Sequence, residues 1–147
     1  MDLVLWRHAE AEDGEDDAGR RLTRKGHKQA ARVAAWLRTH LPKDTRVIVS
    51  PAVRAQQTAE ALSLESETLV LVGPGAHPAA VLKAAGWPDG DGTVVVVGHQ
   101  PTLGAAAALA LTGKAASWRV KKAGVWWLST EGGKDATVMA VIAPDLV

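Results

Sequence analysis

The sequence predicts an α/β protein: a single domain over residues 1–147, with three layers and a mostly parallel central sheet covered by helices on both faces. Short apolar runs alternate along the chain with helical patterns, as in folds of this class. The run Val94–Val97 consists of valines alone, which indicates burial on both faces and therefore a central parallel strand. No internal repeat and no long linker divides the chain.

The apolar runs predict the strands. Leu3–Trp6 ends abruptly at Arg7-His8, which is typical of a short buried strand that leads into a loop. The last two runs, joined by a glycine-containing turn at 131–135, predict a C-terminal β-hairpin. The expected strands cover residues 3–6, 46–50, 68–72, 94–97, 125–128 and 137–142.

Four helices are expected between these strands. The first begins at the N-cap Thr23, carries its apolar stripe at Ala30, Val33, Ala34 and Leu37, and ends before Pro42. Ser50-Pro51 is expected to supply the cap and the first-turn proline of the second helix, which runs to about Leu62. The other two helices cover 78–85 and 101–112, each followed by a glycine, whereas the acidic segment 9–20 is expected to be a loop.

Composition excludes several classes of function. Lys and Arg number 17 against 16 Asp and Glu, so the chain lacks the basic footprint of a general nucleic-acid-binding protein. The absence of cysteine excludes disulfides, thiolate metal sites and cysteine-nucleophile phosphatases. No spaced His/carboxylate set predicts a metal site, and no metal or cofactor is expected. The N-terminal apolar run is too short for a signal peptide or membrane span, which predicts a cytoplasmic protein.

Candidate catalytic residues follow three predicted strands. Arg7-His8 follows the first strand, and His99 follows the valine strand. Arg54 lies in the first turn of the helix that follows the second strand. The carboxyl ends of parallel strands share one edge of a sheet, where ligands bind. A lone histidine in such a place is more often structural. Two arginines and two histidines together predict a crevice for a phosphoryl group, with helix N-termini adding N–H donors.

Four segments resemble the histidine phosphatase superfamily and, within it, the SixA-type phosphohistidine phosphatases. The resemblance runs from residue 3 to about 112, with a weaker similarity at 122–126, and its most specific part is Ser-Pro-x-x-Arg-Ala-x-Gln-Thr. The segments are Trp6-Arg7-His8-Ala9-Glu10-Ala11, Arg20-Arg21-Leu22-Thr23 with Gly26 and Gln29-Ala30, Ser50-Pro51-Ala52-Val53-Arg54-Ala55-Gln56-Gln57-Thr58-Ala59, and Val97-Gly98-His99-Gln100-Pro101.

The resemblance implies a role for each candidate. His8 would attack phosphorus and become a phosphohistidine that water hydrolyses, releasing phosphate. Arg7, Arg54 and His99 would hold the phosphoryl oxygens in the transition state. Arg20 is a further candidate phosphate ligand, with Arg21 as the alternative.

Two positions depart from the pattern of the superfamily. The usual glycine after the nucleophilic histidine is Ala9, and Gln100 stands where phytase-like relatives have an acidic residue. No general acid is evident, although five acidic side chains of the loop, Glu10, Glu12, Asp13, Asp16 and Asp17, are candidates. A missing acid favours an imidazole leaving group, because imidazole needs less protonation than an alkoxide.

The sequence therefore predicts a phosphatase that hydrolyses phosphohistidine on a protein, with a histidine phosphotransfer domain as a candidate partner. The alternatives are a general small-molecule phosphomonoesterase and a catalytically silent phosphate-binding module. The basic cluster Arg20, Arg21, Arg24, Lys25 and Lys28 is either a docking rim for an acidic phosphoprotein or a solvated helix face. Nothing in the sequence predicts the oligomeric state.

Overall fold

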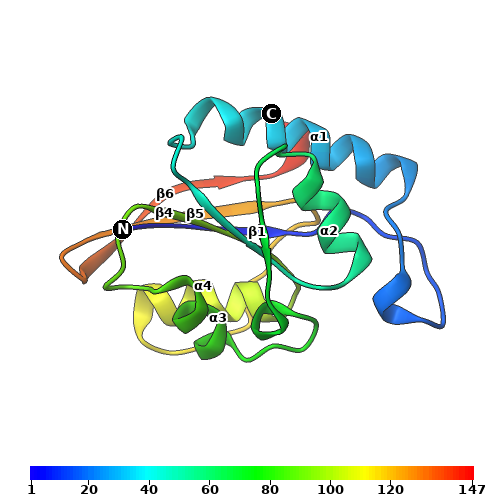
Figure 1. The fold of residues 1–147 in the computed structure, drawn as a ribbon. Coiled ribbons are helices and arrows are strands. Elements are labelled where there is room, and N and C mark those ends of the chain that lie inside the picture. The colour runs from blue at the N-terminus through cyan, green and yellow to red at the C-terminus, as the bar shows by residue number, and fades with distance from the viewer.

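The computed structural model describes residues 1–147, and its centre is a six-stranded sheet with the order β3-β2-β4-β1-β5-β6 (Figure 1). The strands β3, β2, β4 and β1 run parallel, and β5 and β6 are antiparallel to their neighbours. The strand β4 lies between β2 and β1 and is buried throughout, as its valines predict. The strands are β1 (Asp2–Arg7), β2 (Arg46–Val49), β3 (Glu67–Thr68), β4 (Thr93–Gly98), β5 (Val125–Glu131) and β6 (Lys134–Ile142).

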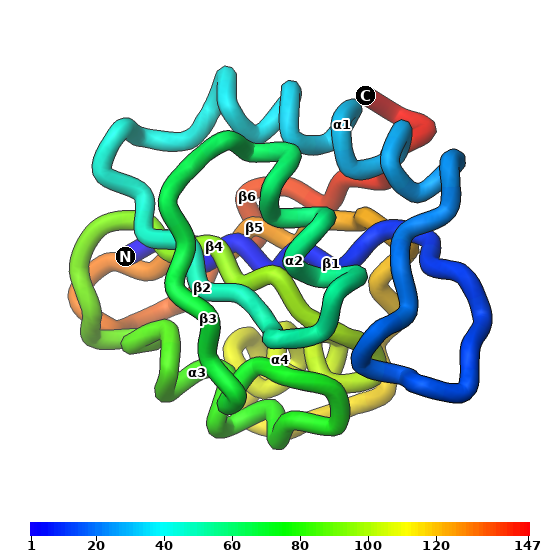
Figure 2. The backbone as a smooth tube through the Cα atoms, turned by 45° about the vertical axis from the view of Figure 1, so that its right-hand side comes forward, coloured from blue at the N-terminus to red at the C-terminus, as the bar shows by residue number.

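Helices cover both faces of the sheet, which confirms the predicted three-layer α/β fold. Figures 1 and 2 show α1 and α2 on one face and α3 and α4 on the other. Alternate residues of β1 enter two separate cores: Val4 and Trp6 pack on the side of α1, and Leu3 and Leu5 pack on the side of α4. The helices are α1 (Arg24–His40), α2 (Val53–Glu60), α3 (Pro78–Ala85) and α4 (Thr102–Thr112).

Two local predictions are wrong. The expected strand 68–72 is reduced to β3 followed by the 3₁₀ turn η2 (Val70–Val72), because this edge strand pairs only with Ile48 and Val49 of β2. The second helix begins at Val53 with Ala52 as its N-cap, not at Ser50-Pro51. Ser50 instead directly follows β2 at the carboxyl edge of the sheet, and its hydroxyl is engaged in the site described below.

Other local predictions are confirmed. The Thr23 hydroxyl accepts a hydrogen bond from the main-chain N–H of Gly26 and so caps α1. The predicted hairpin is present, with strands longer than expected. No helix combines the length and the apolar character that a membrane span requires. The cytoplasmic location stays a prediction.

Candidate active site

The carboxyl edge of the parallel strands brings His8, Arg54 and His99 together. The imidazole rings of His8 and His99 lie 5.1 Å apart, centroid to centroid. The Arg54 Nε–H points at Nε2 of His8 over 3.4 Å. All three side chains are buried, with at most 9% of their surface exposed. Residues that are 46 and 45 positions apart in sequence therefore form one cluster.

The His8 ring is held in one orientation and one tautomer. Its Nδ1 lies 2.7 Å from the main-chain carbonyl oxygen of Ala9, which can only accept a hydrogen bond, so Nδ1 carries the proton. The lone pair of the neutral ring is then on Nε2, the atom that faces Arg54. Burial lowers the pKa of His8 to about 4, and the charges of Arg54 and Arg7 act in the same direction. His8 is therefore an unprotonated base at neutral pH.

His99 is oriented by Ser50. Nε2 of His99 lies 2.7 Å from the Ser50 hydroxyl oxygen, which also accepts a hydrogen bond from the N–H of Ala52. We assign the hydroxyl hydrogen to a bond donated to Nε2, and this assignment leaves the proton of the neutral ring on Nδ1. Nδ1 is buried without a partner, so His99 has a donor available beside His8. Burial lowers the pKa of His99 to about 3, helped by His8 and Arg54.

Arg54 is held by the acidic loop. Its Nη1 donates to the main-chain carbonyl of Asp17 over 2.7 Å, and its Nη2 lies 3.2 Å from the Asp17 carboxylate. Asp17 belongs to the 3₁₀ turn η1 (Asp17–Gly19), which packs against α2. This ion pair places the buried guanidinium next to His8 at a point where the helix dipole alone would disfavour a cation.

Arg20 lies at the rim of the same cluster. Its Nη1 lies 3.1 Å from the Asp17 carboxylate, and its Nε donates to the main-chain carbonyl of Glu12. Its charge also contributes to the low pKa of His8. Arg21 is exposed and makes no side-chain hydrogen bond. Of the two alternatives, Arg20 is the one near His8, and its contact with a phosphate stays a prediction.

Arg7 connects the site to the loop that precedes β5. Its Nη1 donates to the main-chain carbonyl of Val120 over 2.8 Å, whereas its Nε is buried without a partner. The main-chain N–H of Ala123 donates to the carbonyl of His8, and the N–H of Arg7 donates to the carbonyl of Gly124. These bonds hold the loop beside the carboxyl edge of the parallel strands.

Sequence reasoning missed three side chains that build the site. Ser50 was expected to cap a helix, and Asp17 was only one of several acidic candidates. The third is Thr58, whose hydroxyl accepts from the N–H of Ala9 and donates to the carbonyl of Arg54, so that it joins β1 to α2. Ser50 and Thr58 both belong to the most specific motif, which was the available signal. Ala9 itself is fully buried, so the fold accommodates its methyl group.

No proton donor is evident in the cluster. Hydrogen bonds from Arg20 and Arg54 lower the pKa of Asp17, and the hydrogen bond from Thr23 lowers that of Glu10, so both carboxylates are ionised at neutral pH. Gln100 is engaged elsewhere: its side chain binds the main chain of Trp118 and Gly104. No three His, Asp or Glu side chains come close enough together to hold a metal ion.

The histidine assignments predict a nuclear magnetic resonance result. In a titration followed by the ¹⁵N shifts of the imidazole rings, His8 and His99 should remain neutral to below pH 5, and the single N–H proton of each ring should be on Nδ1. Ser50→Ala should change the His99 tautomer signal and leave that of His8 unaltered. A pKa near 6.5 for either ring would contradict the burial argument.

The same pKa values give the sign of a stability change. Because both folded-state values lie below 6.5, the unfolded chain binds more protons between pH 6.5 and about 3. The free energy of unfolding should therefore decrease as the pH falls through this range.

A neutral histidine base flanked by arginines at the carboxyl edge of a parallel sheet is suited to bind a tetrahedral oxyanion such as phosphate. Residues 3–75 match the family model of the histidine phosphatase superfamily, branch 1. The chain is 34% identical to the phosphohistidine phosphatase SixA homolog of Haemophilus influenzae over an alignment of 124 residues. This alignment covers 71% of this chain and 73% of the relative. The chain belongs to the histidine phosphatase superfamily.

Two further proteins are similar to this chain. A Mycobacterium leprae protein is 36% identical over an alignment of 103 residues that covers 66% of this chain, and the chain spans only 61% of that relative's length. The solved structure of the protein histidine phosphatase SixA complexed with tungstate superimposes with a TM-score of 0.86 over 99% of each chain. Its sequence identity is 24%, so this match shows a shared fold.

Proposed function

We propose that this chain is a phosphatase that removes the phosphoryl group from phosphohistidine on a protein, through a covalent intermediate on His8. The observation that carries the proposal is the state of His8, whose ring is neutral, held through Nδ1 and presents the lone pair of Nε2 toward Arg54. The name of the Haemophilus influenzae relative supports the substrate class.

In the first step Nε2 of His8 attacks phosphorus, and the P–N bond of the substrate breaks. No base is needed, because Nε2 is already unprotonated at neutral pH. In the second step water attacks the phosphohistidine, the bond between Nε2 and phosphorus breaks, and phosphate leaves. A nitrogen of such low basicity is also a good leaving group in this second step.

Three cationic or donor groups would stabilise the phosphoryl oxygens. Arg54 lies beside the attacking nitrogen, Arg7 has a buried Nε–H without a partner, and His99 has a buried Nδ1–H. Their positions are set before substrate arrives, which is what makes such donors effective in phosphoryl transfer. Arg20 is a fourth candidate that would have to exchange its bond to Asp17 for one to phosphate.

The lack of a proton donor favours an imidazole leaving group. Asp17 and Glu10 are ionised and Gln100 cannot donate a proton as an acid. A phosphorylated imidazole can carry the required proton on its other ring nitrogen and leave as neutral imidazole, whereas a serine or sugar alkoxide needs an acid. A general phosphomonoesterase is the alternative function, and it requires such an acid.

A substrate panel tests the proposal. The specificity constant kcat/KM should be at least about 100-fold higher for a phosphohistidine protein than for phosphoserine or a sugar phosphate, since general acid catalysis is worth about 10²–10⁴-fold. For aryl phosphates the rate should rise steeply as the pKa of the leaving group falls. Equal rates on phosphohistidine and a sugar phosphate would assign the general phosphomonoesterase instead, and binding without any phosphate release would assign a silent binding module.

A further inference from the structure

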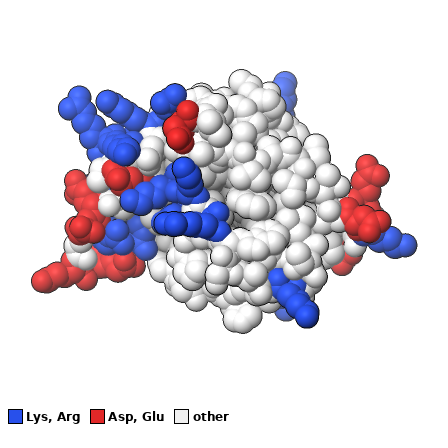
Figure 3. Space-filling model, turned by 180° about the vertical axis from the view of Figure 1, so that it is seen from behind, with Lys and Arg blue, Asp and Glu red and all other residues white.

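A hollow lined only by cationic side chains lies next to the candidate active site. Its volume is about 510 Å³, and Arg7, Arg119, Lys121 and Lys122 line it. The charge of Arg7 also acts on the pKa of His8 and of His99, so the hollow lies beside the histidine cluster. Figure 3 views the molecule from behind relative to Figure 1. It shows that Lys and Arg side chains gather at one end of that face, beside a group of Asp and Glu side chains.

Three of these four cations have no carboxylate partner. Arg119 and Lys121 form no ion pair, and only Lys122 does, with its Nζ 3.7 Å from Glu10. Arg119 is close enough to Arg7 to add to the effect of burial in lowering the pKa of Arg7. Like charges held this close without neutralisation repel each other, and an anion in the hollow would remove that repulsion.

The loop that carries Arg119 and Lys121 is held at a fixed distance from His8. Besides its main-chain bonds to Arg7 and His8, it accepts hydrogen bonds from Trp6 Nε1 and Gln100 Nε2. It also packs directly on α4 at Gly104, where an added Cβ would lie 1.7 Å from the carbonyl oxygen of Trp118. The two cations are therefore placed relative to the nucleophile and do not belong to a freely moving segment.

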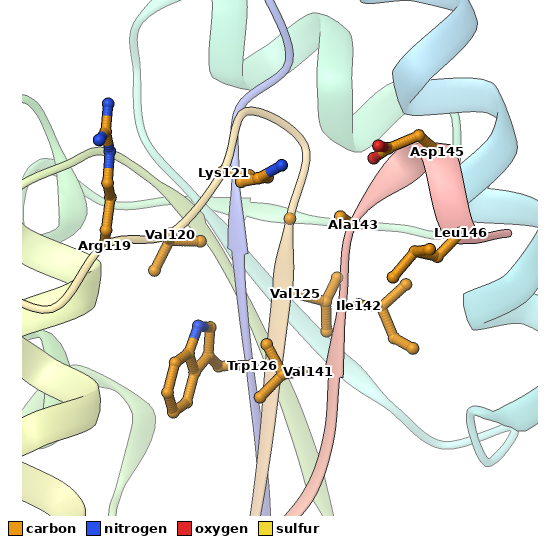
Figure 4. A pocket seen from close by; sticks show the side chains of 11 residues that line it. Arg119, Val120, Lys121, Val125, Trp126, Val141, Ile142, Ala143, Asp145 and Leu146 are labelled. Atoms are coloured by element: carbon orange, nitrogen blue, oxygen red, sulfur yellow. The ribbon is translucent and has the colours of Figure 1, made fainter.

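An apolar groove continues from the hollow. Arg119 and Lys121 line one part of this groove, which has a volume of about 390 Å³. Figure 4 shows them on the loop before β5, with Asp145 across the groove. No ion pair joins Asp145 to either of them. The apolar lining comes from both strands of the hairpin and the C-terminal turn: Val125, Trp126, Val141, Ile142 and Leu146.

A cationic hollow joined to an apolar groove fits the surface of a protein better than it fits a small inorganic anion. Lys121 also lines a third hollow with Lys25, Lys28 and Arg32 of α1, and Asp145 is the one acidic residue in its lining. Arg20, which the sequence grouped with Lys25 and Lys28, points instead into the acidic loop.

We propose that Arg119 and Lys121 form a second anion subsite, which binds a carboxylate of the phosphoprotein substrate close to its phosphohistidine. The inference rests on the proposed function, because it assigns a feature of the substrate of that same site. It makes the enzyme selective for phosphohistidines that lie beside acidic residues, and it requires no change in the chemistry at His8.

The test compares two synthetic phosphohistidine peptides that differ only in the flanking residues, glutamates in one and glutamines in the other. The protein should show a kcat/KM about five- to tenfold higher for the glutamate peptide at low salt, and the preference should shrink as salt is added. The variant Arg119→Gln/Lys121→Gln should reduce the preference to below about twofold. The ratio within one variant is independent of the fraction of folded protein.

The matched control is Lys43→Gln/Lys83→Gln, which removes the same charge from exposed positions near the amino edge of the sheet and should keep the preference. A preference that survives in Arg119→Gln/Lys121→Gln, or is lost equally in the control, would overturn the subsite. A protein that hydrolyses both peptides equally would overturn it and leave the proposed function intact. If the protein hydrolyses neither peptide, both the subsite and the proposed function would be overturned. Equal hydrolysis, with inhibition by pyrophosphate weakened in the subsite variant, would assign the hollow to a second phosphate instead.

Discussion

Replacing His8 with alanine should abolish turnover, with a loss of at least about 10⁴-fold, because the variant has no atom that can form the covalent intermediate. The fold should survive, since the His8 ring makes only two side-chain hydrogen bonds, to Ala9 and Arg54. Circular dichroism should therefore give a melting temperature close to that of the unaltered protein. Near-normal turnover of His8→Ala would rule out the proposed mechanism.

The intermediate itself can be trapped. Rapid quenching in alkali with a radiolabelled phosphohistidine substrate should leave a phosphate on the protein that is stable in alkali and labile in acid. Peptide mapping should place this label on the segment that contains His8, and the label should be missing from His8→Ala. A label on a serine, such as Ser50, would assign a different nucleophile.

Replacing Arg54 with glutamine should reduce kcat/KM by about 10²–10³-fold, the typical cost of losing one preorganised donor to a developing oxyanion. The reason is its position: Arg54 Nε lies 3.4 Å from His8 Nε2, the atom that would bond to phosphorus. The loss should appear mainly in kcat, because the negative charge on the phosphoryl oxygens redistributes in the transition state.

Arg54 also holds the acidic loop through Asp17, and a control separates the two roles. Asp17→Asn removes the ion pair and keeps the bond from Arg54 Nη1 to the main-chain carbonyl of residue 17. If Arg54 acts on phosphate directly, Asp17→Asn should cost less than about tenfold, in line with the modest contribution of an ion pair whose carboxylate is exposed to solvent. An equal loss in both variants would mean that Arg54 acts through the loop.

The fold class could be predicted from local patterns because each pattern reports a strong local constraint. Consecutive valines favour a strand that is buried on both faces, and the stripe from Ala30 to Leu37 favours a helix with one buried face. The prediction of a third strand over 68–72 was wrong because it also used only the local pattern. The segment is apolar and β-branched, but at the edge of the sheet only Glu67 and Thr68 pair with a neighbouring strand.

The sequence also determined which strand ends carry the arginines and histidines, because that depends on spacing and on the common direction of parallel strands. The states of those side chains depend on residues that are distant in sequence. Ser50 orients His99 across 49 positions, Asp17 holds Arg54 across 37, and the carbonyl of Val120 binds Arg7 across 113. Burial then lowers both histidine pKa values. Desolvation and long-range hydrogen bonds exist only once the layers have packed, so no local pattern encodes them.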